Sequence, residues 1–257
     1  MHEVFANAPL QLVVFEVRYE RLAKVGRELF DALSAVVTDG EVDFATANVR
    51  VDQPASPEAA LFHIVDRAGT LAITMWPSSM VVESTDYLHF SPFRQIALEA
   101  FTALSHHLGD HRVSRIGLRY VDEIHPDPSP RRPEEWSRWI RADLTALTGI
   151  TKLPIVGFGG GLTIDIGGDC NLSFRYTTVP GPAVESAGLL RLRPRPASPA
   201  VVLDTDGYWQ PPQPAALDPD DLAAVVNRIH DAVTGVFEQV ITEDSRMLFR
   251  AVDQGEA

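Results

Sequence analysis

The sequence is short of cysteine, of positive charge and of long hydrophobic runs. Its 257 residues include one cysteine, Cys170, which excludes a disulfide or a thiolate zinc site within them and is typical of a reducing compartment. Acidic residues outnumber basic ones by 35 to 22, and the net charge of −13 disfavours binding to nucleic acid or anionic membranes, which depends on Lys and Arg. There is no run of 18 apolar residues and no secretory leader pattern, so we expect a cytoplasmic protein without a membrane span.

The rest of the composition is that of an ordinary folded protein. Hydrophobic residues make up 45% of the chain and charged residues 22%, so a buried core can form without disulfides or a structural metal. The length suits one large domain or two small ones.

The first half of the chain switches between strand and helix patterns. Apolar residues at every second position predict a strand over 12–19, and a spacing of three or four predicts an amphipathic helix over 21–37. Ser91 and Pro92 fit the N-cap and first turn of a second helix. Between the helices, β-rich runs separated by Pro, Gly and Ser predict strands at 42–51, 60–66, 70–76 and 80–88.

The second half follows the same order. A strand is expected over 113–124 and a helix over 134–148, and Asp218 caps a long final helix whose apolar stripe continues to Ile241. Gly167, Gly168 and Asp169 predict a hairpin turn. The intervening strands are expected at 161–167, 170–179, 187–193 and 200–206.

The two halves align best where Phe15–Tyr19 lies over Ile116–Tyr120, since positions 15 and 116 differ by 101. In both segments the tyrosine shares the apolar strand face and the arginine lies on the other. We therefore expect a tandem duplication of a βαββββα unit, with halves 1–110 and 111–257 forming one compact pseudo-two-fold domain. The predicted class is α+β, with a curved, largely antiparallel sheet and helices on one side, as in TATA-binding-protein-like or helix-grip-like topologies.

These segments resemble a sporadically distributed, uncharacterised bacterial family of about this length. The matching residues are Asn7-Ala8-Pro9-Leu10 with Phe15–Tyr19, Arg115-Ile116-Gly117-Leu118-Arg119-Tyr120-Val121, and Phe237-Glu238-Gln239-Val240-Ile241-Thr242-Glu243. The resemblance implies no activity. Asp122 departs from the family pattern, which usually has Asn there, so a family hydrogen bond made by that amide is in doubt.

The arginines give the leading hypothesis about function. Arg18, Arg119 and Arg175 lie on strand faces opposite the apolar ones, and arginine forms planar bidentate pairs with carboxylate or phosphate. The alternative is internal pairing with Glu16, Asp122 or Glu123. We predict a non-enzymatic binding or accessory protein that holds a peptide, a protein partner or a small anionic ligand on its sheet face. The predicted ligand-binding residues are Arg18, Arg119, Arg175, Tyr120 and Trp209.

Two other functions stay open. A metal-assisted hydrolase would use Asp204, Asp206 and Asp165, since carboxylates can hold Mg²⁺ or move protons. A structural subunit would dock through the Pro-rich segments 126–133 and 194–214, and a homodimer is one candidate assembly.

Stronger catalytic signatures are absent from the sequence. Gly157–Gly161 lacks the spacing of a phosphate-binding loop and is better explained as the entry to a strand. Cys170 has no His/Asn context, and His230 fits a hydrogen-bonded polar side chain on the last helix better than a catalytic base. We expect no catalytic residue, resident metal or cofactor.

Overall fold

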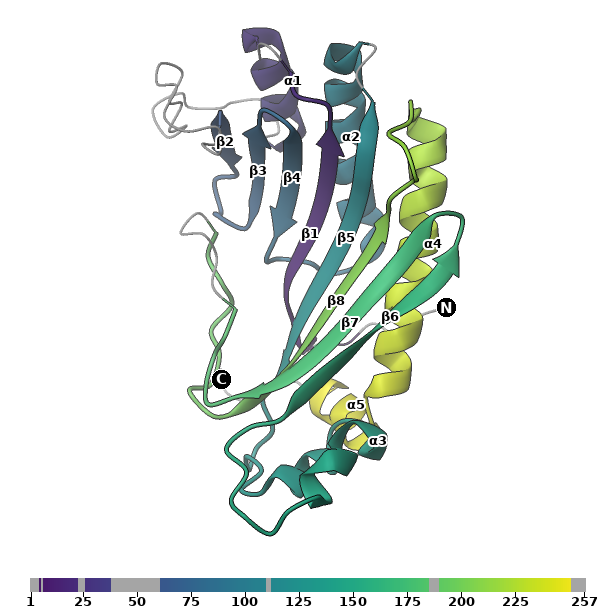
Figure 1. The fold of residues 1–257 in the computed structure, drawn as a ribbon. Helices are drawn as coiled ribbons and strands as arrows, with labels where there is room; N and C mark the ends of the chain where they lie inside the picture. The colour runs from purple at the N-terminus through teal and green to yellow at the C-terminus, as the bar shows by residue number, and fades with distance from the viewer. Residues whose placement is uncertain are drawn as a thin grey trace.

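An eight-stranded antiparallel sheet, curved and twisted, forms the centre of the protein (Figure 1). The computed structural model describes residues 5, 7–22, 26–37, 61–109, 112–184 and 190–250. The strands lie in the order β2-β3-β4-β1-β5-β8-β7-β6. Their bounds are β1 (Leu10–Tyr19), β2 (Phe62–Val65), β3 (Leu71–Trp76), β4 (Ser79–Ser84), β5 (Val113–Ile124), β6 (Gly159–Gly167), β7 (Cys170–Val179) and β8 (Ala200–Trp209).

The central pair of the sheet is formed by β1 and β5, the two strands that carry the aligned segments. Glu16 lies opposite Gly117, Val17 opposite Ile116 and Phe15 opposite Leu118. On one side of this pair the strands come from residues 62–84, and on the other side from residues 159–209. The sheet is therefore continuous across the two halves of the sequence.

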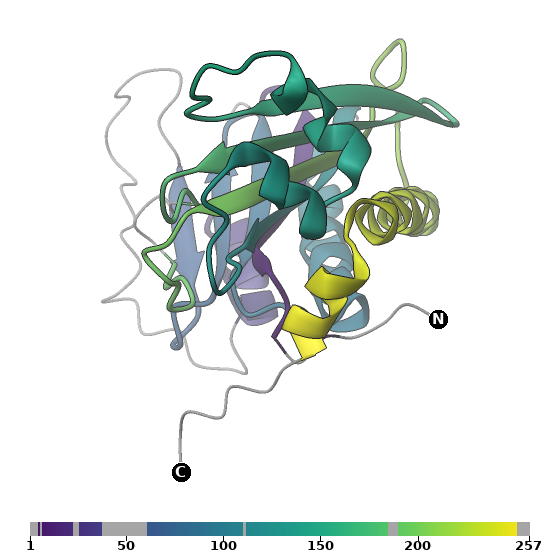
Figure 2. The same cartoon turned by 90° about the horizontal axis from the view of Figure 1, so that it is seen from below.

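Three long helices cover one face of the sheet, which confirms the predicted α+β class with helices on one side (Figures 1 and 2). They are α1 (Arg27–Val37), α2 (Phe90–Leu108) and α4 (Pro219–Val240). The side chains of Phe15, Phe101 and Phe174 are fully buried in the core between these layers. None of the described helices combines the length and the hydropathy that a membrane-spanning segment requires.

The cap of α4 is the one expected from the sequence. The Asp218 side chain accepts a hydrogen bond from the Asp221 amide at 2.8 Å, and Pro219 is in the first turn. The helix ends at Val240, and the extended backbone of the C-cap residue Ile241 separates it from α5 (Glu243–Arg250). In α2 the N-cap position is taken by His89, so the assignment of Ser91 as N-cap was wrong.

The helix predicted over 134–148 is broken into short pieces, and this prediction was wrong. They are a 3₁₀ turn at Pro133–Arg138, α3 (Ala142–Thr145) and a second 3₁₀ turn at Ala146–Gly149. Between them Ile140 forms an isolated β-bridge with Ile241, and the Arg141 amide donates to the Val240 carbonyl. These long-range bonds to the end of α4 require extended backbone where a continuous helix would run.

The remaining strand predictions have mixed outcomes. The Gly167–Asp169 turn joins β6 to β7, and all three of its residues have positive φ. The predicted strand 187–193 is wrong for residues 190–193, which form no strand, and its other residues lie outside those described. The predicted strand 42–51 also lies outside the described residues.

The sheet face away from the long helices is covered at one end by described residues between β7 and β8. Val184 and Leu190 pack on it in a small second core with Leu12, Val121 and Val202. This part of the chain is tied to the β2–β3 side of the sheet, because the Arg191 amide donates to the Gly69 carbonyl at 2.6 Å. The rest of this face, which we call the open face, carries the polar residues described next.

Candidate functional site

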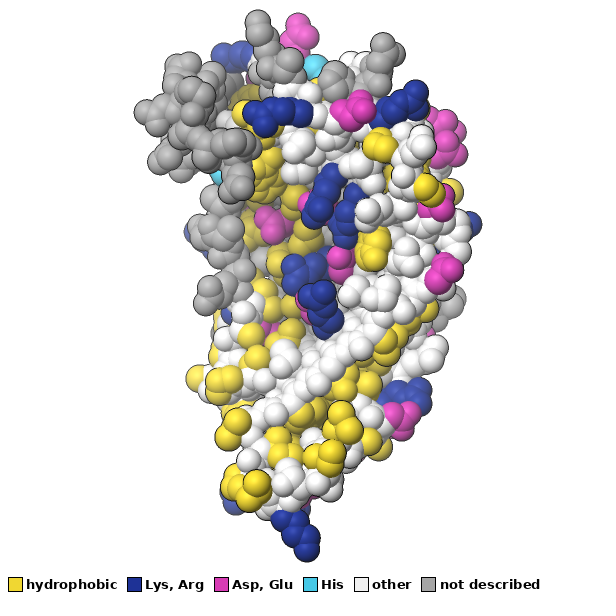
Figure 3. Space-filling model, in the orientation of Figure 1, with side chains coloured by type: hydrophobic (Ala, Val, Ile, Leu, Met, Phe, Trp, Pro, Cys, Tyr) yellow, Lys and Arg dark blue, Asp and Glu magenta, His cyan; other side chains and the backbone are white. Residues whose placement is uncertain are grey.

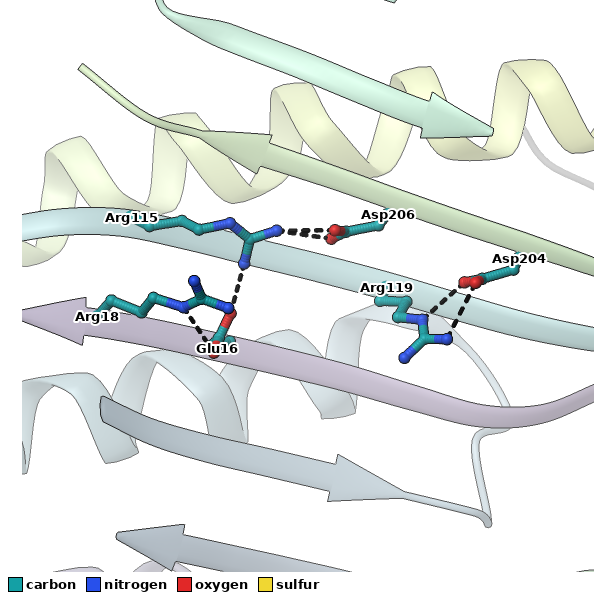
Figure 4. A network of polar contacts seen from close by, with 6 residues as sticks. All are labelled: Glu16, Arg18, Arg115, Arg119, Asp204 and Asp206. Carbon is teal, nitrogen blue, oxygen red and sulfur yellow. Dashed lines mark hydrogen bonds and ion pairs between the residues drawn. The ribbon is translucent and has the colours of Figure 1, made fainter. Parts of the chain in front are cut away.

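A strip of alternating charges crosses the centre of the open face (Figure 3). It consists of Glu16 and Arg18 on β1, Arg115 and Arg119 on β5, and Asp204 and Asp206 on β8. Within each strand these positions differ by two or four in number, so the pleat places their side chains on the same face. We call these six residues the charged strip (Figure 4).

Arg115 connects the two sides of the strip. Its Nη1 donates to Glu16 Oε2, and its Nη2 donates to both carboxylate oxygens of Asp206, at 3.0 and 2.8 Å. The guanidinium lies over the ring of Tyr208, 4.9 Å from the ring centroid. Only 13% of the Arg115 side chain is exposed, so its donors are committed to holding the strip together.

Arg119 and Arg18 are also paired but are much more exposed. Arg119 forms a bidentate pair with Asp204, through Nε at 2.6 Å and Nη2 at 2.9 Å, and 47% of its side chain is exposed. Arg18 donates through Nε to Glu16 at 2.9 Å, and 55% of its side chain is exposed. These hydrogen bonds raise the pKa of both guanidinium groups, so both stay charged.

Burial disfavours the charged form of one carboxylate of the strip and of an acid next to it. Burial raises the pKa of Asp206 above its ordinary value, even though Arg115 acts in the opposite direction. Burial likewise raises the pKa of Glu83 on β4, whose charge interacts with Arg119. The strip contains three arginines and three acids, so its charges nearly balance. Its exposed hydrogen-bond donors are on Arg18 and Arg119.

Of the ion pairs expected between the strand arginines and nearby acids, the structure contains one. Arg18 pairs with Glu16, as that alternative expected, whereas Arg119 pairs with Asp204 on a strand 85 residues later in the sequence. The other two acids named as partners lie elsewhere. Glu123 bonds Arg195 and His125, and Asp122 faces the helices.

The five predicted ligand-binding residues do not converge on one site. Arg175 is exposed on the open face, opposite Asp204 in the β7–β8 register, and so lies on the same face as Arg18 and Arg119. Tyr120 and Trp209 are buried in the core on the helix-covered face. The sheet backbone separates the two groups.

The sequence analysis missed residues that contact the predicted ones on each face of the sheet. Arg115 was on the predicted face but was not named as a site residue, although the Arg-x-Gly-x-Arg spacing from Arg115 to Arg119 could have indicated it. On the other face, the Tyr120 hydroxyl lies 3.1 Å from His230 Nδ1 and 3.4 Å from the Tyr87 hydroxyl. His230 is a hydrogen-bonded polar side chain, as predicted.

The three aspartates of the hydrolase hypothesis do not gather at one place. Asp204 and Asp206 are bound to arginines, and Asp165 on β6 accepts from the Gly167 amide in the hairpin turn. In the strand register Asp165 is level with Tyr208, four residues beyond Asp204. Among the described residues, no group of three or more His, Cys, Asp or Glu side chains could hold a metal ion.

Two other sequence interpretations can be compared with the structure. The glycine run does lead into a strand, since β6 begins at Gly159. The Pro-rich segment 194–214 contains β8, which is paired on both sides within the sheet. Comparison of the chain with protein-family models and with curated proteins gave no match.

Proposed function

We propose that this protein is a non-enzymatic binding protein that holds an acidic peptide segment of a partner protein against its open face. The observation that carries the proposal is the state of Arg18 and Arg119. Each is about half exposed, and each bonds a carboxylate through only part of its guanidinium. A guanidinium has five N–H donors, so both arginines retain N–H groups that can donate to a further carboxylate.

The spacing of these arginines favours a peptide over a small anion. Arg18 lies opposite Arg115, and Arg119 is four residues farther along β5. Four residues of strand span about 13 Å, which is longer than a single phosphate or carboxylate group. An extended peptide with two separated carboxylates can contact both arginines at once.

We also infer that the sheet arose by duplication of one strand-helix-strands-helix unit. Three observations support this: the strand order is symmetric about the β1–β5 pair, both central strands carry an Arg-Tyr pair, and Glu16 lies opposite Gly117. Positions 16 and 117 differ by 101, the offset at which the sequences align, as expected if a local two-fold axis relates the aligned segments. The topology would then be of the duplicated, TATA-binding-protein-like kind.

An array of immobilised peptides tests the binding proposal. The peptides contain two glutamates at varied spacing, and matched peptides contain glutamine or lysine instead. We expect the wild-type protein to be retained by widely spaced glutamate pairs, and the variant R18A/R119A to lose this retention. Arg141→Ala is the control, because Arg141 is also half exposed and pairs with an acid, Asp143, but lies outside the strip. Equal retention of the wild type and the double variant would contradict the proposal.

A further inference from the structure

A cavity of about 590 Å³ lies on the helix-covered side of the sheet, opposite to the charged strip. It opens to solvent and is lined by β5, α4, the start of α2 and the segment that leads into β1. Its volume is in the range of small-molecule sites. Aromatic rings form much of its wall, contributed by Phe5, Tyr87, Phe90, Tyr120 and Phe237.

Asp122 lines this cavity from β5 and has no side-chain partner among the described residues. Only 6% of the residue is exposed, yet its carboxylate accepts no hydrogen bond and forms no ion pair in the described part of the chain. Glu123, the next residue, is also a buried acid, but its carboxylate has several hydrogen-bond partners. It accepts from the amides of Ala183 and Val184 and from Arg195, and lies 3.0 Å from His125 Nε2. Buried carboxylates are usually compensated in the way that Glu123 is.

The other polar groups around the cavity add negative charge. Asp231 and Glu238 on α4 also line it, and none of its lining residues is Lys or Arg. Tyr87, Tyr120 and His230 form one hydrogen-bonded group beside Asp122, with the Phe90 ring stacked on His230 at 3.6 Å. Ring faces and carboxylates both attract cations, and aromatic-lined pockets are a known way of binding ammonium groups.

We propose that this cavity binds a protonated amine with an aromatic or aliphatic body, whose ammonium group donates to the Asp122 carboxylate. The ammonium supplies the hydrogen bonds and the positive charge that Asp122 lacks, and the rings of Tyr87 and Phe90 surround its apolar body. The site is independent of the proposed peptide surface, because the two lie on opposite faces of the sheet.

The proposal includes a dependence on pH. Burial raises the pKa of Asp122 to about 8, so in the empty cavity the carboxyl is mostly neutral at pH 7 and mostly charged at pH 9. The charged fraction rises from roughly one tenth to roughly nine tenths, and amine affinity should rise about tenfold over this range. The other titratable groups facing the cavity are Tyr87, Tyr120, His89, His230, Asp231 and Glu238, and an aliphatic amine stays largely protonated throughout.

Fluorine NMR of two matched probes tests the site. The probes are 4-fluorophenethylamine and the neutral 2-(4-fluorophenyl)ethanol, each titrated with the full chain at pH 7 and pH 9. We expect the wild type to bind the amine more tightly than the alcohol at pH 9, with the rise in amine affinity given above. Absence of amine binding, or equal affinity for the two probes, would overturn the proposal.

Asp122→Asn is the decisive variant because it keeps the shape of the side chain and removes its charge. It should bind the amine about tenfold more weakly at pH 9, should lose the pH dependence, and should bind the alcohol as the wild type does. Asp143→Asn, an exposed carboxylate outside the cavity, is the control and should behave as the wild type. Retention of the pH-dependent amine preference in Asp122→Asn would refute the assignment. The peptide array does not depend on Asp122, so the two proposals fail separately.

Discussion

The guanidinium group of Arg115 lies across Gly117, in the space where any other residue would place its Cβ. Both residues are on the open face of β5, two positions apart. The absence of a side chain at Gly117 allows Arg115 to reach Glu16 on β1 and Asp206 on β8 at the same time. The glycine is therefore a structural requirement of the charged strip.

Gly117→Ala should displace Arg115 and weaken both of its ion pairs. The added methyl displaces the guanidinium, and the weakening of its charge-assisted hydrogen bonds to Glu16 and Asp206 should lower the free energy of unfolding by about 1–3 kcal/mol. Urea denaturation gives this value. Gly149→Ala is the control, because nothing lies within 4 Å of a Cβ at that position. Equal stability of the Gly117→Ala and Gly149→Ala variants would show that Arg115 moves aside freely.

Arg115→Ala should destabilise the protein more than removal of an exposed arginine does. It leaves Glu16 and Asp206 facing each other without the cation between them, which should cost about 1–3 kcal/mol, since a charge-assisted bond to a partly buried group is lost. Arg141→Ala removes an exposed pair with Asp143 and should cost less than about 0.5 kcal/mol. The comparison requires only chemical denaturation of the two variants.

Asp122→Asn should remove a pH dependence of stability. The native pKa of Asp122, about 8, is well above the value of about 3.9 for an unfolded aspartate. Between these values the unfolded chain releases a proton that the native protein keeps, so wild-type stability falls as the pH rises from about 4 to about 8. The free energy of unfolding of the variant should equal that of the wild type near pH 4 and exceed it by a few kcal/mol at pH 8.5. A lower stability of the variant at pH 8.5, measured by urea denaturation, would contradict this.

Glu123→Ala should release Ala183 and Val184 from the sheet, because it removes the oxygen that accepts from both of their amides. The Glu123 carboxylate accepts from two backbone amides and from Arg195, and these bonds together with His125 lower its pKa although burial acts in the opposite direction. Breaking a buried pair of this kind typically costs about 3–5 kcal/mol. Faster hydrogen exchange at the amides of Ala183 and Val184 is the expected readout. Glu134→Ala, in an exposed pair with Arg132, should leave this exchange unchanged.

The sequence predicted the features that depend on local pattern. Alternation along β1 and β5 correctly placed Arg18 and Arg119 on one face and Tyr120 on the other, and the Asp218 cap follows from residues within one helical turn. Features that depend on residues distant in the sequence could not be predicted from local pattern. The choice of Asp204 as the partner of Arg119 depends on the β5–β8 register, and the break at Ile140 depends on a bridge to Ile241, 101 positions later.

The isolation of Asp122 was likewise not visible in the sequence. Asp122 and Glu123 are adjacent acids in one strand, and their residue types suggest the same environment. The pleat directs Glu123 towards cationic and amide partners and Asp122 into an acidic, aromatic cavity. Only the packing of α4 and the start of α2 against β5 determines that difference.

The alternation of β5 means that the charged strip and the cavity cannot change independently by insertion or deletion. Arg119 and Glu123 face one side, while Tyr120 and Asp122, which lie between them in the sequence, face the other. A slip of one residue would turn the arginine into the cavity and expose the tyrosine, exchanging the whole set of side chains at once. Descendants of this chain can therefore alter either surface by point substitution, but the length of this strand is fixed by both.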